Sequence, residues 1–115
     1  MSLLSEVKTL LTSVSGLSIG SMPSTPDNAV TLYGTGGYPR DLTGTQVEEL
    51  TFQVMVRSTT YAAAETLCST IDDLLHGHGT TKVLVIQKMS GPFDLGRDAN
   101  GRAEMSMNYR CYYRK

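Results

Sequence analysis

The sequence contains no long uninterrupted apolar segment, and its charges nearly cancel. Its first sixteen residues are partly apolar, but Glu6 and Lys8 interrupt them and no basic leader precedes them, which argues against a secretory signal peptide. We therefore expect a cytosolic product. Hydrophobic residues make up 40% and charged residues 18%, a composition typical of a globular protein that indicates neither disorder nor a membrane span. The net charge is −1 at pH 7, so the charge of the chain as a whole does not favour binding to nucleic acid.

Cysteine is scarce, and neither cysteine belongs to a reactive or metal-binding motif. Cys68 and Cys111 lie on predicted apolar faces, without CxxC or Cys/His spacing. Such positions favour buried, reduced thiols. A disulfide or a reactive thiol is the alternative.

The motifs of common enzyme classes are also missing. The sequence has no G-x-S-x-G nucleophile elbow and no H-E-x-x-H zinc motif. Gly34, Gly36 and Gly37 follow a predicted strand, but no Gly-Lys-Ser/Thr comes after them and no helix begins there. A phosphate cradle would therefore lack both its lysine and its helix dipole. We interpret these glycines as part of a mobile loop, and we predict no catalytic residue and no cofactor.

One small cluster has the chemistry of metal ligands. His76 and His78 follow Asp72 and Asp73, but these residues span a predicted helix end and have glycines between them. Histidine at a helix C-terminus is already favoured by the helix dipole. We predict no metal site; a small metal- or ligand-binding domain that uses His76, His78 and Asp72 is the alternative.

Length and charge distribution say more about organisation. A chain of 115 residues predicts one domain over residues 1–115. Residues 1–81 hold three basic and eight acidic side chains, a balance of −5, and residues 82–115 hold seven basic and three acidic ones, a balance of +4. Opposite charges at two ends favour head-to-tail association of copies and, if the rotation closes, a ring. The alternative is that folding mixes the charges in space.

Apolar periodicity alternates between helix and strand spacing. It predicts a helix over residues 3–14, with Ser2 as N-cap and Gly16 as the stop, and a second helix from a cap at Ser58, Thr59 or Thr60 to Gly77. Strands are predicted at 17–22, 29–33, 49–57, 82–88 and 103–113. The order α-β-β-β-α-β-β indicates an α+β fold, in which a mainly antiparallel sheet of about five strands carries two helices on one face.

Three of these strands carry further information. Residues 49–57 alternate most clearly and predict a strand with one covered face. The run "KVLVIQK" is almost continuously apolar, which predicts a central strand covered on both faces. In 103–113 the alternation places Met105, Met107, Tyr109, Cys111 and Tyr113 on one side.

The segment "GRDANGRAE", residues 96–104, resembles a ligand loop because it carries Asp98, Asn100, Gly101 and Glu104. An EF-hand calcium loop with Gly101 at its glycine position would place Gly96 at the first ligand position and Met107 at the last, and neither can serve. The segment also separates two strands rather than two helices. Asn-Gly between strands is a strong signal for a hairpin turn, so we predict a turn here.

What remains is an interaction protein, and several segments have the composition of contact surfaces. Tyr and Arg are enriched at protein interfaces, and loops 34–47 and 90–99 each carry aromatic or apolar residues beside a proline. Loops of this length in a small domain usually have a task, although these side chains could instead fold back onto the core. The predicted interface residues are Tyr38, Arg40, Phe93, Leu95, Arg97, Arg110, Tyr112 and Arg114.

Three stretches in order carry a family resemblance. They are "TPDNAVTLYGTGGYPRD", "LTFQVMVRSTTYAAAETLCSTIDDLLHG" and "SGPFDLGRDANGRAEMSMNYR". Together they resemble the minor capsid proteins of long-tailed bacteriophages, which are similar to tail terminator (tail completion) proteins. The matching elements are Pro26-Asp27-Asn28, Gln53, Val54, Val56, Arg57, Tyr61, residues 73–77, Pro92-Phe93, residues 96–98 and residues 100–102.

The resemblance implies a virion structural protein assembled in the bacterial host cytoplasm. It implies a ring, commonly a hexamer, on the head-proximal end of the tail tube, where the ring stops tube growth and joins tail to head. The implied partners are other copies of the chain, the tail tube protein and a head or neck connector protein. DNA would pass through the lumen without being read, and no membrane is involved. A neck adaptor between portal and tail is the alternative within the virion class.

Overall fold

A computed structural model describes residues 3–37 and 47–114. In chain order the elements are α1 (Leu3–Leu10), β1 (Leu17–Ile19), β2 (Ala29–Gly37), β3 (Val47–Ser58), α2 (Tyr61–Leu75), β4 (Val83–Arg97) and β5 (Ala103–Arg114). The order α-β-β-β-α-β-β is the one predicted from periodicity. The prediction that Gly34, Gly36 and Gly37 belong to a mobile loop is wrong, because β2 continues through them. Neither helix in this part of the chain is long and apolar enough to cross a membrane.

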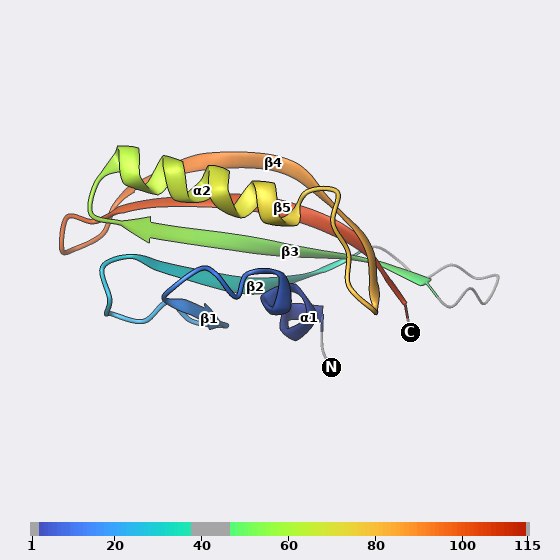
Figure 1. The fold of residues 1–115 in the computed structure, drawn as a ribbon. Coiled ribbons are helices and arrows are strands. Elements are labelled where there is room, and N and C mark those ends of the chain that lie inside the picture. The colour runs from blue at the N-terminus through green and yellow to red at the C-terminus, as the bar shows by residue number, and fades with distance from the viewer. Residues whose placement is uncertain (1–2, 38–46, 115) are drawn as a thin grey trace.

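The strands form one sheet in the order β1-β2-β3-β5-β4, which confirms the predicted α+β class (Figure 1). All neighbouring pairs are antiparallel except β1 and β2, which are parallel. The longest regular pairing joins β3 and β5, from Val47 opposite Arg114 to Ser58 opposite Ala103. β1 and β4 are therefore the two outer strands among those described.

Both helices cover the same face of this sheet, and the core lies between the helices and that face. The side chains that alternate toward the helices are fully or almost fully buried: Val30, Leu32, Phe52, Val54, Val56, Met105, Met107, Tyr109 and Cys111. The rings of Phe52 and Tyr109 stack on neighbouring strands with their centroids 5.3 Å apart. The alternation of β3 and β5 in the sequence thus predicts their covered face correctly, since successive side chains in a strand point to opposite faces.

Helix α1 ends at Leu10, four residues earlier than its apolar spacing predicts. After it, the Leu11 amide bonds to the Lys8 carbonyl and the Val14 amide to the Leu11 carbonyl, a tighter spacing than in an α-helix. Leu11 is still fully buried, so the core contact persists although the helix does not. Gly16 has a φ of +72°, and a Cβ there would lie 2.5 Å from the Asn28 carbonyl oxygen, so the turn requires glycine.

Helix α2 begins as predicted. Thr60 is the N-cap, and its side chain accepts a hydrogen bond from the Ala63 amide at 3.1 Å, as expected for this residue type. The helix ends at Leu75, and Gly77 follows with a φ of +79°. The residues after it then run back along β4.

The prediction that "KVLVIQK" forms a central strand covered on both faces is wrong. β4 is the outermost described strand on its side of the sheet, and Leu84 and Val85 are 42% and 38% exposed. Its outer edge is instead covered by residues 76–80. The Gly77 amide donates to the Ile86 carbonyl, the Ile86 amide donates to the His78 carbonyl, and the Lys88 amide donates to His76 Nδ1. A short segment that satisfies the edge amides replaces the missing neighbouring strand.

The two cysteines are free and buried, which confirms the prediction of reduced core thiols. Burial raises the pKa of Cys68 to about 11, with the Glu65 carboxylate adding to the shift, and burial raises the pKa of Cys111 to about 11. At pH 8 a thiol with such a pKa is about 0.1% thiolate, the reactive form.

Both thiols are therefore expected to react with a water-soluble disulfide reagent at pH 8 at least a hundredfold more slowly in the native protein than in denaturant. The rate of colour release with and without urea measures this. Two thiols that react equally fast in both conditions would contradict their burial.

Candidate assembly surfaces

Asp98 organises the turn between β4 and β5. Its carboxylate accepts hydrogen bonds from the amides of Asn100 and Arg102 at 3.0 and 2.9 Å, and from Arg102 Nε at 2.8 Å. Gly101, with a φ of +76°, donates its amide to the Asp98 carbonyl. The segment 96–104 is thus the hairpin turn that Asn100-Gly101 predicted, and three donors from the turn itself already bind the Asp98 carboxylate.

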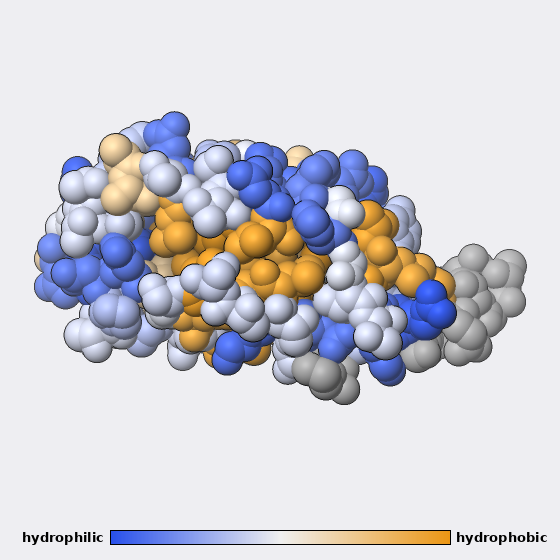
Figure 2. Space-filling model, in the orientation of Figure 1, coloured by the Kyte–Doolittle hydropathy of each residue, from blue (hydrophilic) through white to orange (hydrophobic). Residues whose placement is uncertain are grey.

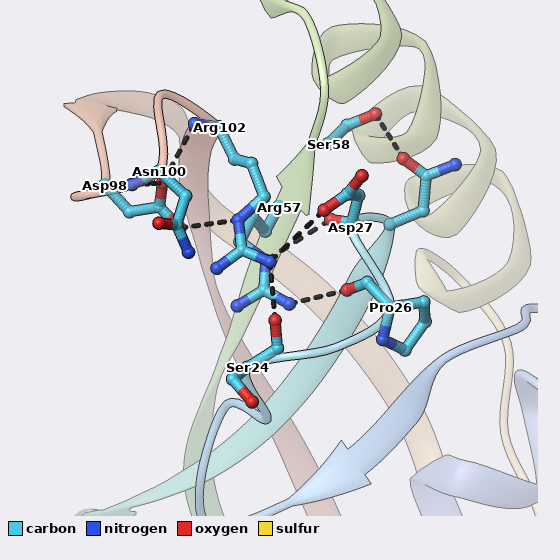
Figure 3. A network of polar contacts seen from close by, with 9 residues as sticks. Ser24, Pro26, Asp27, Arg57, Ser58, Asp98, Asn100 and Arg102 are labelled. Carbon is cyan, nitrogen blue, oxygen red and sulfur yellow. Dashed lines mark hydrogen bonds and ion pairs between the residues drawn. The ribbon is translucent and has the colours of Figure 1, made fainter.

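Two buried arginines join this turn to a distant loop (Figure 3). Arg102 is 8% exposed and donates to the Ser24 carbonyl at 2.6 Å, in addition to its contacts with Asp98. Arg57, at the end of β3, is 3% exposed and donates to the carbonyls of Pro26 and Asp27 at 2.6 and 3.2 Å. The arginine cluster, meaning Arg57, Arg102 and these partners, therefore fixes the 24–27 segment against one end of the sheet.

Several residues that carry the family resemblance meet in or beside this cluster. They are Pro26, Asp27, Asn28, Arg57, Asp98, Asn100 and Arg102, with Asn28 accepting from the Ser58 hydroxyl at 2.7 Å. Segments that are separated by 30 to 78 residues are brought together here. The structure therefore explains why these residue types occur together: buried guanidinium groups require hydrogen-bond acceptors at fixed positions.

The Asp98 carboxyl has a lowered pKa, below its ordinary 3.8, chiefly because it accepts the Arg102 amide and also because of the Arg102 guanidinium and the Asn100 amide. A lowered folded-state pKa stabilises the protein above the ordinary pKa, and this contribution is lost as the pH falls through the folded value. The Asp98→Asn variant is therefore expected to have a lower free energy of unfolding than the native protein at pH 7. This difference in free energy is expected to be smaller at pH 3. Urea midpoints at both pH values test this, with Asp73→Asn on the exposed side of α2 as the control.

The second half of β4 carries exposed apolar side chains. Phe93 and Leu95 are each 48% exposed, so their side chains do not fold back onto the core. They belong to a strand, however, and not to the loop 90–99 that was predicted: β4 extends to Arg97. The pairing with β5 shifts register after Lys88, after Ser90 and after Asp94, and these irregularities break the period that would have identified a strand in the sequence.

The hydrogen bonds from residues 76–80 reach β4 only as far as Lys88. Beyond it, no described strand pairs with the outer side of β4. Arg97 lies at the end of this half, is exposed, and donates to the Gly101 carbonyl at 2.7 Å. Phe93, Leu95 and Arg97, three of the predicted interface residues, are thus grouped at the hairpin end of the sheet.

A groove lies on the helix face, on the side of α2 that is turned toward β2. It has a volume of about 410 Å³ and is lined by Ala62, Ala63 and Leu67 together with the polar Asn28, Ser58, Thr66 and Thr70. Figure 2 shows apolar side chains gathered at the surface on this face, below α2. No motif in the sequence marked this groove, because its apolar residues continue the helical stripe that also forms the core.

Arg110, Tyr112 and Arg114 lie near the other end of β5. Arg110 is opposite Gln87, and Tyr112 is opposite Val85, so Tyr112 is about 20 Å along the strand from the Ser106 that faces Phe93. Arg110 is engaged within the chain: it donates to Gln87 at 2.8 Å and to Glu49 at 3.1 Å. Tyr112 and Arg114 are exposed on the face away from the helices. Tyr38 and Arg40, also predicted at an interface, lie outside the described residues.

Folding mixes the charges that are separated along the sequence. Lys88 pairs with Asp72 at 3.4 Å, Arg102 with Asp27 at 3.4 Å, and Arg110 with Glu49 at 3.1 Å. Each pair joins a basic residue of 82–115 to an acidic residue of 1–81. The uneven distribution of charge therefore gives no simple positive and negative end, which weakens the charge-based case for head-to-tail association.

The residues of the alternative metal site have other partners. Asp72 accepts the Tyr109 hydroxyl at 2.8 Å and pairs with Lys88, and His76 Nδ1 accepts the Lys88 amide. Burial and the Asp72 carboxylate hold the pKa of Tyr109 well above its usual range. Among the described residues, no group of three or more His, Cys, Asp and Glu is placed to hold a metal ion.

A sequence model of the bacteriophage tail terminator protein family matches residues 4–115. The chain belongs to this family. It is therefore a structural protein of the phage tail and a component of the virion. This confirms the family resemblance seen in the three sequence stretches.

Solved structures share the fold of this tail terminator protein. A chain from the virion of a native gene transfer agent particle superposes with a TM-score of 0.71 at 15% identity, covering 98% of this chain and 95% of that one. A second solved chain gives a TM-score of 0.51 at 15% identity, covering 90% and 84%. At this identity the likeness concerns the fold alone. No curated protein matches the chain.

For a tail terminator protein, the sequence identified part of the exposed surface and missed the rest. Phe93, Leu95 and Arg97 were found from composition, whereas the groove beside α2 and the arginine cluster were not. The family resemblance marked Arg57, Asp98 and Arg102 as motif residues, but nothing in the sequence showed that they meet in space. The exposed Arg97 and the buried Arg102 thus lie on the two sides of the same hairpin turn.

Proposed function

We propose that the protein forms a homo-oligomeric ring at the head-proximal end of the tail tube, ends tube growth there, and gives the head a surface to join. Membership of the tail terminator family supports this. The observation that carries the proposal is the pair Phe93 and Leu95, each 48% exposed at an outer strand of the sheet. Exposed apolar side chains that gather on one part of a surface are typical of contact sites.

Termination by such a ring requires two different faces. A tube grows by adding rings whose exposed faces match, so a terminator must copy one of these faces and present another on its opposite side. The two ends of the sheet differ in chemistry, with Phe93, Leu95 and Arg97 at one end and Tyr112 and Arg114 at the other. This difference supports a protein that binds the tube protein at one end and a head or neck connector at the other.

The proposed mechanism is assembly by shape and charge, with no bond made or broken. Both thiols are buried with raised pKa values, and the cluster of Asp72, His76 and Lys88 is occupied in joining α2 to β4. DNA passes through the proposed lumen without base recognition. The net charge of −1 supports this, since it gives the chain as a whole no electrostatic basis for binding DNA.

Electron microscopy of tubes assembled from the tail tube protein tests this function. Adding the terminator protein in increasing amounts is expected to shorten the tubes and to place a cap at one end only. Tubes that keep their length and bind no terminator protein would contradict the proposal. Binding to a head connector without binding to tubes would identify a neck adaptor instead.

A further inference from the structure

We propose that neighbouring subunits are joined by a heterologous contact, in which Phe93 and Leu95 of one copy enter the groove beside α2 of the next copy. These two side chains are called the β4 knob, and the groove lined by Asn28, Ser58, Ala62, Ala63, Thr66 and Leu67 is called the α2 groove. The inference rests on the proposed ring and names the surfaces that close it. The occupant of the groove is thus a second copy of the same chain.

The knob is suited to side-chain docking and not to strand addition. A long exposed edge strand invites pairing with any other strand, and proteins blunt such edges with proline and bulges. The half of β4 beyond Lys88 contains Pro92 and three register shifts, while residues 76–80 cover the half before it. Backbone pairing is therefore discouraged along β4, yet Phe93 and Leu95 remain 48% exposed, which leaves their side chains as the means of contact.

The groove has the composition of a receiving site. Ala62, Ala63 and Leu67 give it apolar surface, and Asn28, Ser58, Thr66 and Thr70 give it polar surface. Interfaces also combine apolar and polar surface. The groove is an open hollow of about 410 Å³, so side chains of another molecule can enter it directly.

The two surfaces lie on opposite sides of the molecule. The sheet order places β4 at one edge and β2 toward the other, and the groove is on the β2 side of α2. Phe93 lies opposite Ser106, on the sheet face away from the helices, whereas the groove is on the helix face. The β4 edge of one copy can therefore lie over the groove side of a rotated neighbour. Repetition of this contact closes a ring when a whole number of such rotations makes a full turn.

Charged side chains flank both surfaces, and each has an opposite charge beside it. Asp94 and Arg97 line one shallow pocket next to the hairpin. Asp27 directly precedes Asn28 of the groove, and its side chain contacts Arg102 while remaining 64% exposed. Charge is thus balanced within each surface, and the apolar side chains of the knob and the groove carry the proposed contact.

Two single-surface variants test the contact. In the knob variant, Phe93→Ser is combined with Leu95→Ser. In the groove variant, Thr66→Arg fills the groove with a long charged side chain. Each is expected to weaken self-association at least about 30-fold, as for the central residues of an interface. Thr66 is exposed on α2 and arginine is a better helix former than threonine, so the groove variant should stay folded, and circular dichroism checks both.

Matched controls separate the contact from general surface effects. Val85→Ser changes an exposed apolar side chain in the covered half of the same strand, and Ser69→Arg adds the same charge on the β4 side of α2. Both controls are expected to assemble like the native chain. Arg97→Glu is expected to weaken association while the monomer keeps its fold.

Mixing the two variants gives the decisive result. The knob variant retains an intact groove, and the groove variant retains an intact knob, so the mixture has one functional contact per pair. Analytical ultracentrifugation is expected to show two monomeric proteins separately and a 1:1 heterodimer when they are mixed. An isologous contact gives no such rescue, because each partner would supply a damaged copy of the same patch.

The outcomes distinguish this inference from the proposed function. If the native chain forms a ring and both variants form it equally well, the knob and groove are not the contact, while the proposed ring stands. If both variants are monomeric and the mixture also stays monomeric, the heterologous pairing is wrong. If the native chain is monomeric at every concentration with and without tubes, the proposed ring itself fails.

Discussion

The Arg102→Ala substitution is expected to lower the free energy of unfolding by about 3 kcal/mol. Arg102 is 8% exposed and its guanidinium binds the Asp98 carboxylate and the Ser24 carbonyl. Its removal leaves these acceptors without their donor. We expect the cost at the lower end of the range for breaking a buried pair, because the Asp98 side chain keeps 18% of its exposure. The melting temperature should fall by about 12 °C.

Arg97 supplies the matched control for this prediction, because it lies on the other side of the same turn and is exposed. Arg97→Ala should change stability by less than about 0.5 kcal/mol. Arg102→Lys should fall between the two, since lysine keeps the charge but lacks the forked geometry. Urea unfolding measures all three. Equal stabilities for Arg102→Ala and Arg97→Ala would show that the arginine cluster does not fix this end of the sheet.

The Phe52→Ala substitution is expected to cost about 4 kcal/mol. Phe52 is fully buried beneath the helices and stacks on Tyr109 with a centroid distance of 5.3 Å. Alanine removes the apolar area, leaves a cavity in a close-packed layer and breaks the aromatic pair. Thermal or urea unfolding monitored by circular dichroism measures the loss.

Met55 provides the comparison, because it lies on the same strand but on the opposite, partly exposed face. Met55→Ala is expected to cost about 1 kcal/mol. The ratio of the two losses reports how completely the helices cover one face of the sheet. Similar losses at both positions would contradict an arrangement with both helices on the same side.

The strands that the sequence predicted best are those whose two faces differ. β3 and β5 are covered by helices on one face only, so apolar and polar residues alternate along them and the period of two is visible. The prediction for β4 was wrong because the burial of its side chains does not follow from their residue types. Leu84 and Val85 are apolar but exposed, and the edge is covered by the backbone of residues 76–80. Coverage by backbone has no side-chain period and leaves no signal in the sequence.

The candidate surfaces were only partly predictable for a related reason. Phe93 and Leu95 stand out in composition, because apolar residues beside a proline in a polar stretch indicate exposure. The sequence could not predict that Arg57 and Arg102 belong to one cluster. Their acceptors at Ser24, Pro26 and Asp27 are main-chain carbonyls. Any residue type supplies a carbonyl, so three-dimensional proximity alone identifies these partners.

The arginine cluster holds in place the hairpin beside the proposed β4 knob. The cluster fixes the hairpin and the 24–27 segment at the same end of the sheet (Figure 3). Phe93, Leu95 and Arg97 belong to the strand that enters this hairpin. A contact surface on a fixed support loses less conformational entropy on assembly than one on a free loop. Variants of the cluster should therefore weaken assembly as well as stability.

The mass of the purified protein in solution, measured by light scattering over a wide concentration range, tests the proposed assembly most directly. A ring closed by one repeated contact predicts a single discrete species at a small whole-number multiple of the monomer mass, which keeps this mass as concentration increases further. A monomer at every concentration, or a mass that grows without limit, would contradict it.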